Sequence, residues 1–115
     1  MSSTPMFWQG VFGFTGTGLH SPAPLDPSLS YVVPPGMTAQ PLYFRGGNSS
    51  DELVYVTLTR DGESMRVFPM GAKASVNVPL RVVSDVDPDS VLALTFAAPH
   101  GCTGSIVVDL GWVLV

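Results

Sequence analysis

The residues that could bind a transition metal are few and lie far apart in the sequence. His100-Gly101-Cys102 is the only cluster of nitrogen and sulfur ligands, and a second histidine would have to be His20. Small copper sites in β-sandwich proteins use His, Cys and Met ligands, but no Met follows Cys102 to act as an axial ligand. Because a lone cysteine commonly behaves as a small buried hydrophobic residue, the sequence predicts no metal and no cofactor here.

Oxygen ligands come closest together in a short acidic segment. Asp85, Asp87 and Asp89 alternate along a predicted turn and could offer oxygens to Ca²⁺, which takes six to eight of them. Pro88 interrupts the segment, and Phe96 stands where a helix-loop-helix calcium site has its bidentate glutamate. We interpret the segment as a solvated turn with aspartates in capping positions, and we keep calcium as the alternative.

Aromatic side chains supply the other candidate ligand site. Tyr43 and Trp112 could stack on a sugar ring, because an apolar ring face packs on the C–H face of a sugar and each residue keeps a polar group. With the three aspartates they form the candidate site of a lectin-like domain that binds a small ligand. The competing interpretation is that a chain of this length needs most of its aromatic residues in the core.

Catalytic motifs are absent from the sequence. There is no Gly-x-Ser-x-Gly elbow, and the glycine-rich segment 13–18 is followed by neither the lysine nor the helix of a phosphate loop. An enzyme would have to build its site across subunits, around His20, His100 and Cys102. The sequence therefore favours a protein that is not an enzyme.

The elements that position these residues are predicted to be strands. Leu53 to Arg60 alternates β-branched and apolar residues with the period of a half-buried strand, and Glu63 to Phe68 continues the pattern. Asp61-Gly62 between them predicts a hairpin closed by a two-residue type I′ turn. No window of 12 residues combines a helical period with freedom from Gly and Pro.

The remaining alternating segments complete an all-β pattern. In Ala74 to Val83, Pro79 cannot donate to a ladder, which predicts a free edge or a bulge at this strand. We expect Ser105 to Val115 to be a central strand. The sequence predicts one domain, residues 1–115, folded as an antiparallel β-sandwich or jelly roll of about eight short strands. The other expected strands are Met6 to Phe14 (interrupted by Gly10 and Gly13), Ser30 to Val33, Thr38 to Arg45 and Val91 to Ala97.

Charge and hydropathy exclude several classes of partner. Charged residues make up 12% of the chain, the formal net charge is -4 and the five basic residues are scattered, so no basic patch is available for nucleic acid. No apolar run reaches the roughly 18 residues of a membrane-spanning helix. The N-terminus lacks the pattern of a signal peptide, which predicts a cytoplasmic protein and leaves export by another route open.

The most unusual feature is the charge-poor N-terminal third, residues 1–40. Asp26 is its only charged residue, whereas the other 13 charged residues lie in the rest of the chain. Exposed apolar residues in such a segment would form a large patch, and obligate subunit interfaces are depleted in charge. The segment is therefore a predicted interface, with candidate contact residues Met6, Phe7, Trp8, Val11, Phe12 and Phe14.

These observations favour a non-enzymatic interaction or structural module, such as an accessory subunit or a particle component. It would work as a homo-oligomer or in a permanent hetero-complex. The alternative function is a lectin-like carbohydrate-binding domain assisted by calcium.

Overall fold

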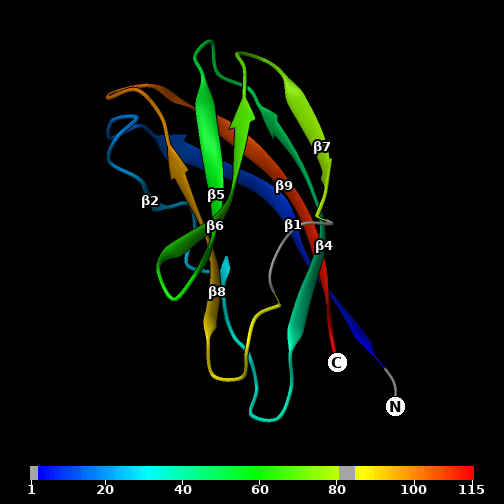
Figure 1. Cartoon of the computed structure of the whole chain (residues 1–115). Coiled ribbons are helices and arrows are strands. Elements are labelled where there is room, and N and C mark those ends of the chain that lie inside the picture. The colour runs from blue at the N-terminus through cyan, green and yellow to red at the C-terminus, as the bar shows by residue number, and fades with distance from the viewer. Residues whose placement is uncertain (1–2, 81–84) are drawn as a thin grey trace.

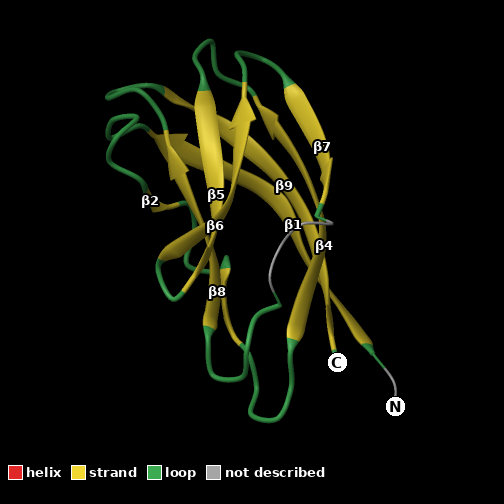
Figure 2. Cartoon of the chain, viewed as in Figure 1, coloured by secondary structure: helices red, strands yellow, loops and turns green. Residues whose placement is uncertain are grey.

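The alternating segments fold into two antiparallel sheets that pack face to face in the computed structural model (Figures 1 and 2). The structure describes residues 3–80 and 85–115. The four-stranded sheet has the order β1 (Thr4–Thr15), β9 (Thr103–Leu114), β4 (Ala39–Asn48) and β7 (Ser75–Pro79). The second sheet holds β2 (Ala23–Pro24), β3 (Ser30–Val32), β8 (Val91–Ala97), β5 (Val54–Arg60) and β6 (Glu63–Met70).

The order of the strands is that of a jelly roll. β2 and β3 both pair with β8, so they are the two halves of one interrupted strand. Counted in this way, the described residues form eight strands, and the chain changes sheet at every connection except the β5–β6 hairpin. The predicted all-β sandwich is confirmed. Within the described residues there is no helix that could cross a membrane.

The hairpin between β5 and β6 forms as the sequence predicts. Asp61 and Gly62 both have positive φ angles, 51° and 82°, which is the backbone conformation of a type I′ turn. The side chain of Asp61 also accepts a hydrogen bond from the backbone N–H of Val91 at 2.8 Å. The turn is thereby tied to the start of β8, the neighbour of β5 in the sheet.

The core lies between the sheets and is built from every second residue of the central strands. β9 is central in its sheet, as predicted, and its inward-facing side chains are all buried. Phe44 of β4 and Phe68 of β6 stack across the interior with ring centroids 4.2 Å apart. Burial of these apolar side chains is the main stabilising contribution to the fold. The inward-facing residues of β9 and β8 are Ile106, Val108, Leu110, Trp112, Leu114, Leu92, Leu94 and Phe96.

Strand β1 differs from its prediction. Gly10 and Gly13 do not interrupt it, and it pairs with β9 along its whole length, from Thr4 to Thr15. Gly10 is covered by the ring of Phe12, which would lie 3.0 Å from a Cβ atom at that position. Pairing with a long central strand therefore outweighs the low strand propensity of the two glycines.

Candidate functional site

The six candidate interface residues of β1 divide between the two faces of the sheet. Phe7 and Val11 point outward and are 55% and 68% exposed. Phe14 is buried in the core, and three further side chains are half-buried against the core: Met6, Trp8 and Phe12. The hypothesis that all six lie at an interface is wrong for Phe14, which is buried in the core of its own subunit. For the other five it stays a prediction, and they lie on opposite faces because a strand turns successive side chains to opposite faces.

The edge of β1 is open along most of its length. β1 is the first strand of its sheet, and within the described residues β9 is its only strand partner. It has 12 residues, none of them charged, and its one proline is Pro5, near its start. An edge strand presents a row of unpaired backbone N–H and C=O groups that can pair with another chain.

Strands that lie at the other edges are short or carry proline and charge. β7 has five residues, ends at Pro79 and is the last strand of its sheet, as predicted for a strand with Pro79 at a free edge. It also lies close to β6 of the other sheet. β6 contains Glu63, Arg66 and Pro69. β2 and β3 have two and three residues. Within the described part of the chain, β1 is thus the edge strand with the least protection against pairing.

The three aspartates of the predicted calcium turn are exposed but do not converge. Asp85 accepts a hydrogen bond from the side-chain amide of Gln40 at 3.3 Å, and Asp89 has a positive φ angle of 67°. Residues 81–84 lie outside the described part of the chain. Among residues 3–80 and 85–115, no group of three His, Cys, Asp or Glu side chains could hold a metal ion.

The histidines and the cysteine lie in loops around one end of the sandwich. His20 and His100 are exposed, whereas Cys102 is half-buried just before β9. The two loops are joined by backbone hydrogen bonds, such as Gly16 N–H to Cys102 C=O. The described side chains do not form a cluster with the three ligands of a metal site, and the site across subunits proposed from the sequence is not tested by a single chain.

The two aromatic candidates for ligand binding have different positions. Trp112 is 1% exposed and packs against Trp8, with ring centroids 4.7 Å apart, so its interpretation as a stacking platform is wrong. Its side chain belongs to the core because its position in β9 faces inward. Tyr43 lies on the outer face of the four-stranded sheet and is half-exposed.

Tyr43 belongs to a network that the sequence did not reveal. Its hydroxyl donates a hydrogen bond to Asp109 Oδ1 at 2.8 Å, and the amide of Gln9 donates to the same oxygen at 3.2 Å. The guanidinium of Arg45 lies over the Tyr43 ring, 5.4 Å from its centroid. A Cβ atom on Gly111 would lie 2.5 Å from the Tyr43 ring, so glycine at this position allows the ring to lie over β9.

The pKa of Tyr43 is raised above its usual value of 10.0. Desolvation by burial is the main cause, the hydrogen bond to Asp109 and the negative charge of that carboxylate add to it, and the positive charge of Arg45 opposes it. The hydroxyl therefore keeps its proton at neutral pH and remains a donor to Asp109.

Pairing between strands extends this network into a polar row across the outer face. Gln9 of β1 pairs with Asp109 of β9, Asp109 with Arg45 of β4, and Arg45 with Asn77 of β7. We call these four residues the polar row. Each of the four strands contributes one polar side chain to the row, and neighbouring strands lie about 4.8 Å apart.

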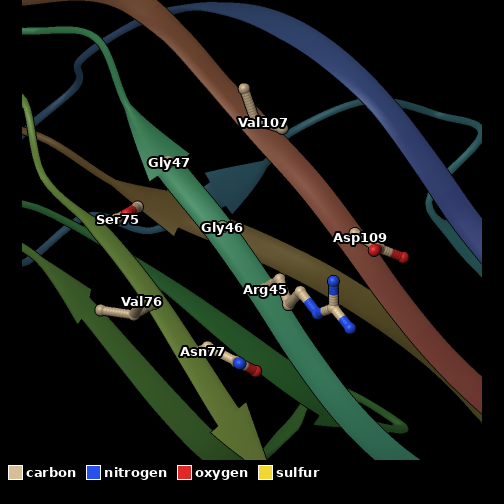
Figure 3. A pocket seen from close by; sticks show the side chains of 8 residues that line it. All are labelled: Arg45, Gly46, Gly47, Ser75, Val76, Asn77, Val107 and Asp109. Carbon is tan, nitrogen blue, oxygen red and sulfur yellow. The ribbon is translucent and has the colours of Figure 1, made fainter.

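A shallow groove of about 560 Å³ lies over β4, next to the residues that β9, β4 and β7 contribute to the polar row (Figure 3). Gly46 and Gly47 of β4 form its floor, and side chains from β9 and β7 flank it. Figure 3 shows Arg45 and Asp109 extending from neighbouring strands on this face. The flanking side chains are Val107 and Asp109 on one side and Ser75, Val76 and Asn77 on the other.

Comparison with known proteins supports the fold and little else. No protein-family model and no curated protein matches the chain. A chain of the Bacillus endospore appendages, described as a novel family of disulfide-linked pili, is similar with a TM-score of 0.51 and 14% identity, over 97% of this chain and 90% of that one. An exo-β-1,3-galactanase from Phanerochaete chrysosporium, solved with galactose, has a TM-score of 0.39 and 12% identity, over 94% of this chain and 29% of that one.

Proposed function

We propose that the protein is a structural module that associates with a second copy of itself through the edge of β1. The observation that carries this proposal is the open, uncharged, 12-residue edge, flanked on the outer face by the exposed side chains of Phe7 and Val11. A strand of this length and composition would favour aggregation if it stayed unpaired, so a specific partner strand is the economical explanation.

A second β1 strand fits this edge better than β7 does. β7 is less than half as long and ends in a proline, whereas two β1 strands match in length. An antiparallel pair of identical strands has two-fold symmetry, the commonest symmetry of soluble oligomers. The two four-stranded sheets would then join into one continuous sheet of eight strands.

The side chains of β1 suit one register of this pair. If Gln9 lies opposite Gln9 of the second copy, Phe7 lies opposite Val11 of the second copy on the outer face. On the inner face Trp8 lies opposite Gly10 of the second copy, where the ring of Phe12 covers the glycine. An apolar cross-strand pair such as Phe7 with Val11 of the second copy contributes about 0.2–1 kcal/mol.

The likeness to the endospore appendage chain supports a role in assembly without defining it. That chain belongs to disulfide-linked pili and shares the fold over nearly the whole of this chain. This protein has one cysteine, the half-buried Cys102, and our proposal depends on backbone pairing, not on a disulfide. Jelly-roll domains place their sheet edges at the sides of the sandwich, where such pairing can occur.

The calcium-assisted lectin function has weaker support. Of its five candidate residues, Trp112 is buried, and the three aspartates do not converge with other ligands in the described residues. Of the five candidates, Tyr43 alone lies beside a groove that a ligand could enter. That groove does not resemble a calcium site, because Arg45 would repel a cation.

The test compares two substitutions at opposite edges of one row of the sheet. Val11 and Ser75 occupy the same row through Val107 and Gly47. We expect Val11→Lys to convert a dimer of twice 12.1 kDa into a monomer, because a lysine on an edge strand opposes strand pairing. Ser75→Lys should leave the mass of the dimer unchanged. Light scattering at micromolar concentration measures both.

Each outcome bears on a different part of the proposal. A parent protein with the mass of one subunit would contradict association. A series of larger species would contradict the symmetric pairing, because that pairing uses the one β1 edge of each copy and stops at two copies. Equal masses of the two variants would show that the association does not use this edge.

A further inference from the structure

We propose that the groove over β4 on the outer face of the four-stranded sheet binds a neutral saccharide without calcium. This function is additional to the assembly function, since the groove lies between β9 and β7, away from the free edge of β1. The juxtaposition that carries the proposal is Asp109, Arg45 and Asn77 on three neighbouring strands beside a floor of glycine.

The polar groups of the groove have hydrogen-bonding capacity to spare. Asp109 uses Oδ1 for Tyr43 and Gln9, and Oδ2 has no partner among the described residues. In the same part of the chain, no hydrogen bond or ion pair is found for the guanidinium of Arg45 or the amide of Asn77. The groove thus offers both donors and acceptors within a short distance, as a vicinal pair of hydroxyl groups requires.

The charges of the groove select a neutral ligand. Arg45 and Asp109 face each other in the pairing of β4 with β9, so their charges cancel. A phosphate or carboxylate would be attracted by Arg45 and repelled by Asp109. A metal cation would be attracted by Asp109 and repelled by Arg45. A polyhydroxylated molecule without charge can accept from the guanidinium and donate to the carboxylate at the same time.

The apolar parts of the groove fit the C–H face of a sugar. Gly47 leaves open space above β4, since a Cβ atom there would meet only the side chain of Val107 at 3.7 Å or more. Val107 is exposed and flanks this space. Tyr43 positions the two charged residues: it holds Asp109 by a hydrogen bond, and its ring lies under the guanidinium of Arg45. Binding sites combine apolar walls with a few placed polar groups in this way.

The test is a titration of the ¹⁵N-labelled protein followed by two-dimensional NMR. The probes are cellohexaose, laminarihexaose, galactose, mannose and chitotriose at about 10 mM, which detects dissociation constants in the millimolar range. We expect at least one probe to shift the amide signals of β4, β7 and β9 around the groove, and to do so equally in EDTA and in calcium.

Matched arginine variants separate the groove from the rest of the surface. Arg45→Ala should weaken binding by about tenfold or more, because the fork of donors is lost, and Arg45→Lys should restore only part of it. Arg66→Ala, on β6 of the other sheet, should bind as the parent does. Asn77→Ala should also weaken binding.

The proposal is overturned if none of the five saccharides shifts these signals, if Arg45→Ala binds as tightly as the parent does, or if inorganic phosphate shifts the groove signals while the saccharides do not. A requirement for calcium would also overturn it. These results do not depend on the mass of the associated species that light scattering measures, so this proposal and the assembly proposal can fail separately.

Discussion

Strands β1 and β7 are the two edges of one four-stranded sheet, and they differ in length, in the position of their proline and in the elements that lie near them. β1 has 12 uncharged residues and an open edge, whereas β7 has five residues, ends at Pro79 and lies close to β6. Natural sheets protect exposed edges by shortness, proline and covering elements. β7 shows all three devices and β1 shows none of them along most of its length, so β1 is the edge on which the assembly proposal depends.

Substitutions on the two faces of β1 should have the largest and most unequal effects. Trp8→Glu should unfold the protein or cost at least about 3–5 kcal/mol, because Trp8 packs on Trp112 and a charge would enter the core. Phe7→Glu should cost less than about 1 kcal/mol of monomer stability and should abolish association. Urea denaturation and light scattering on both variants measure the difference. Similar losses of stability would show that Phe7 is not on the outer face.

A cysteine pair sharpens the comparison between the two edges. In a Cys102→Ser background, Gln9→Cys should form a disulfide between subunits under mild oxidation. The Cα atoms of directly opposed residues lie about 4.5–5.5 Å apart in an antiparallel pair, within the range of a disulfide. Asn77→Cys, at the β7 end of the same row, should stay reduced. Non-reducing electrophoresis compares them, and equal crosslinking of both would contradict the proposed register.

Restoring a backbone donor to the β7 edge should have the smallest effect. Pro79→Thr should change the free energy of unfolding by about 1 kcal/mol or less, since one constraint on the unfolded chain is lost and one edge N–H is gained. The number of subunits in the associated species should stay the same, because β7 remains short and close to β6. A variant that forms larger species would show that Pro79 alone protects this edge.

The fold could be read from the sequence largely because its signals are local. Asp61-Gly62 predicted its turn from the need for positive φ angles, and the apolar segment Ser105 to Val115 predicted the central strand β9. Apart from Phe14, the candidate interface residues stay a prediction. Composition marked residues 1–40 as charge-poor, but only the pleat of β1 decides that Phe7 faces outward and Trp8 inward.

The polar row could not be predicted, because it depends on pairing between distant parts of the chain. Gln9 and Asp109 are 100 residues apart, and Arg45 and Asn77 lie on strands whose order in the sheet no local pattern reveals. Asp109 lies on the outer side because its neighbours in β9, Val108 and Leu110, face the core. Its neighbours in the polar row required the jelly-roll order and the register shift between Pro41 and Tyr43.

The buried amide of Asn48 has a consequence for how the protein can be made. Asn48-Ser49-Ser50 has the form of a glycosylation acceptor. Asn48 is 4% exposed, and its Nδ2 lies 2.8, 3.3 and 3.1 Å from the carbonyl oxygens of Glu52, Met70 and Gly71. The nitrogen that would carry a glycan is thus the one that ties the end of β4 to the loop after β6. In a eukaryotic secretory host, glycosylation would have to precede folding, and each molecule so modified would be unable to close this part of the sandwich.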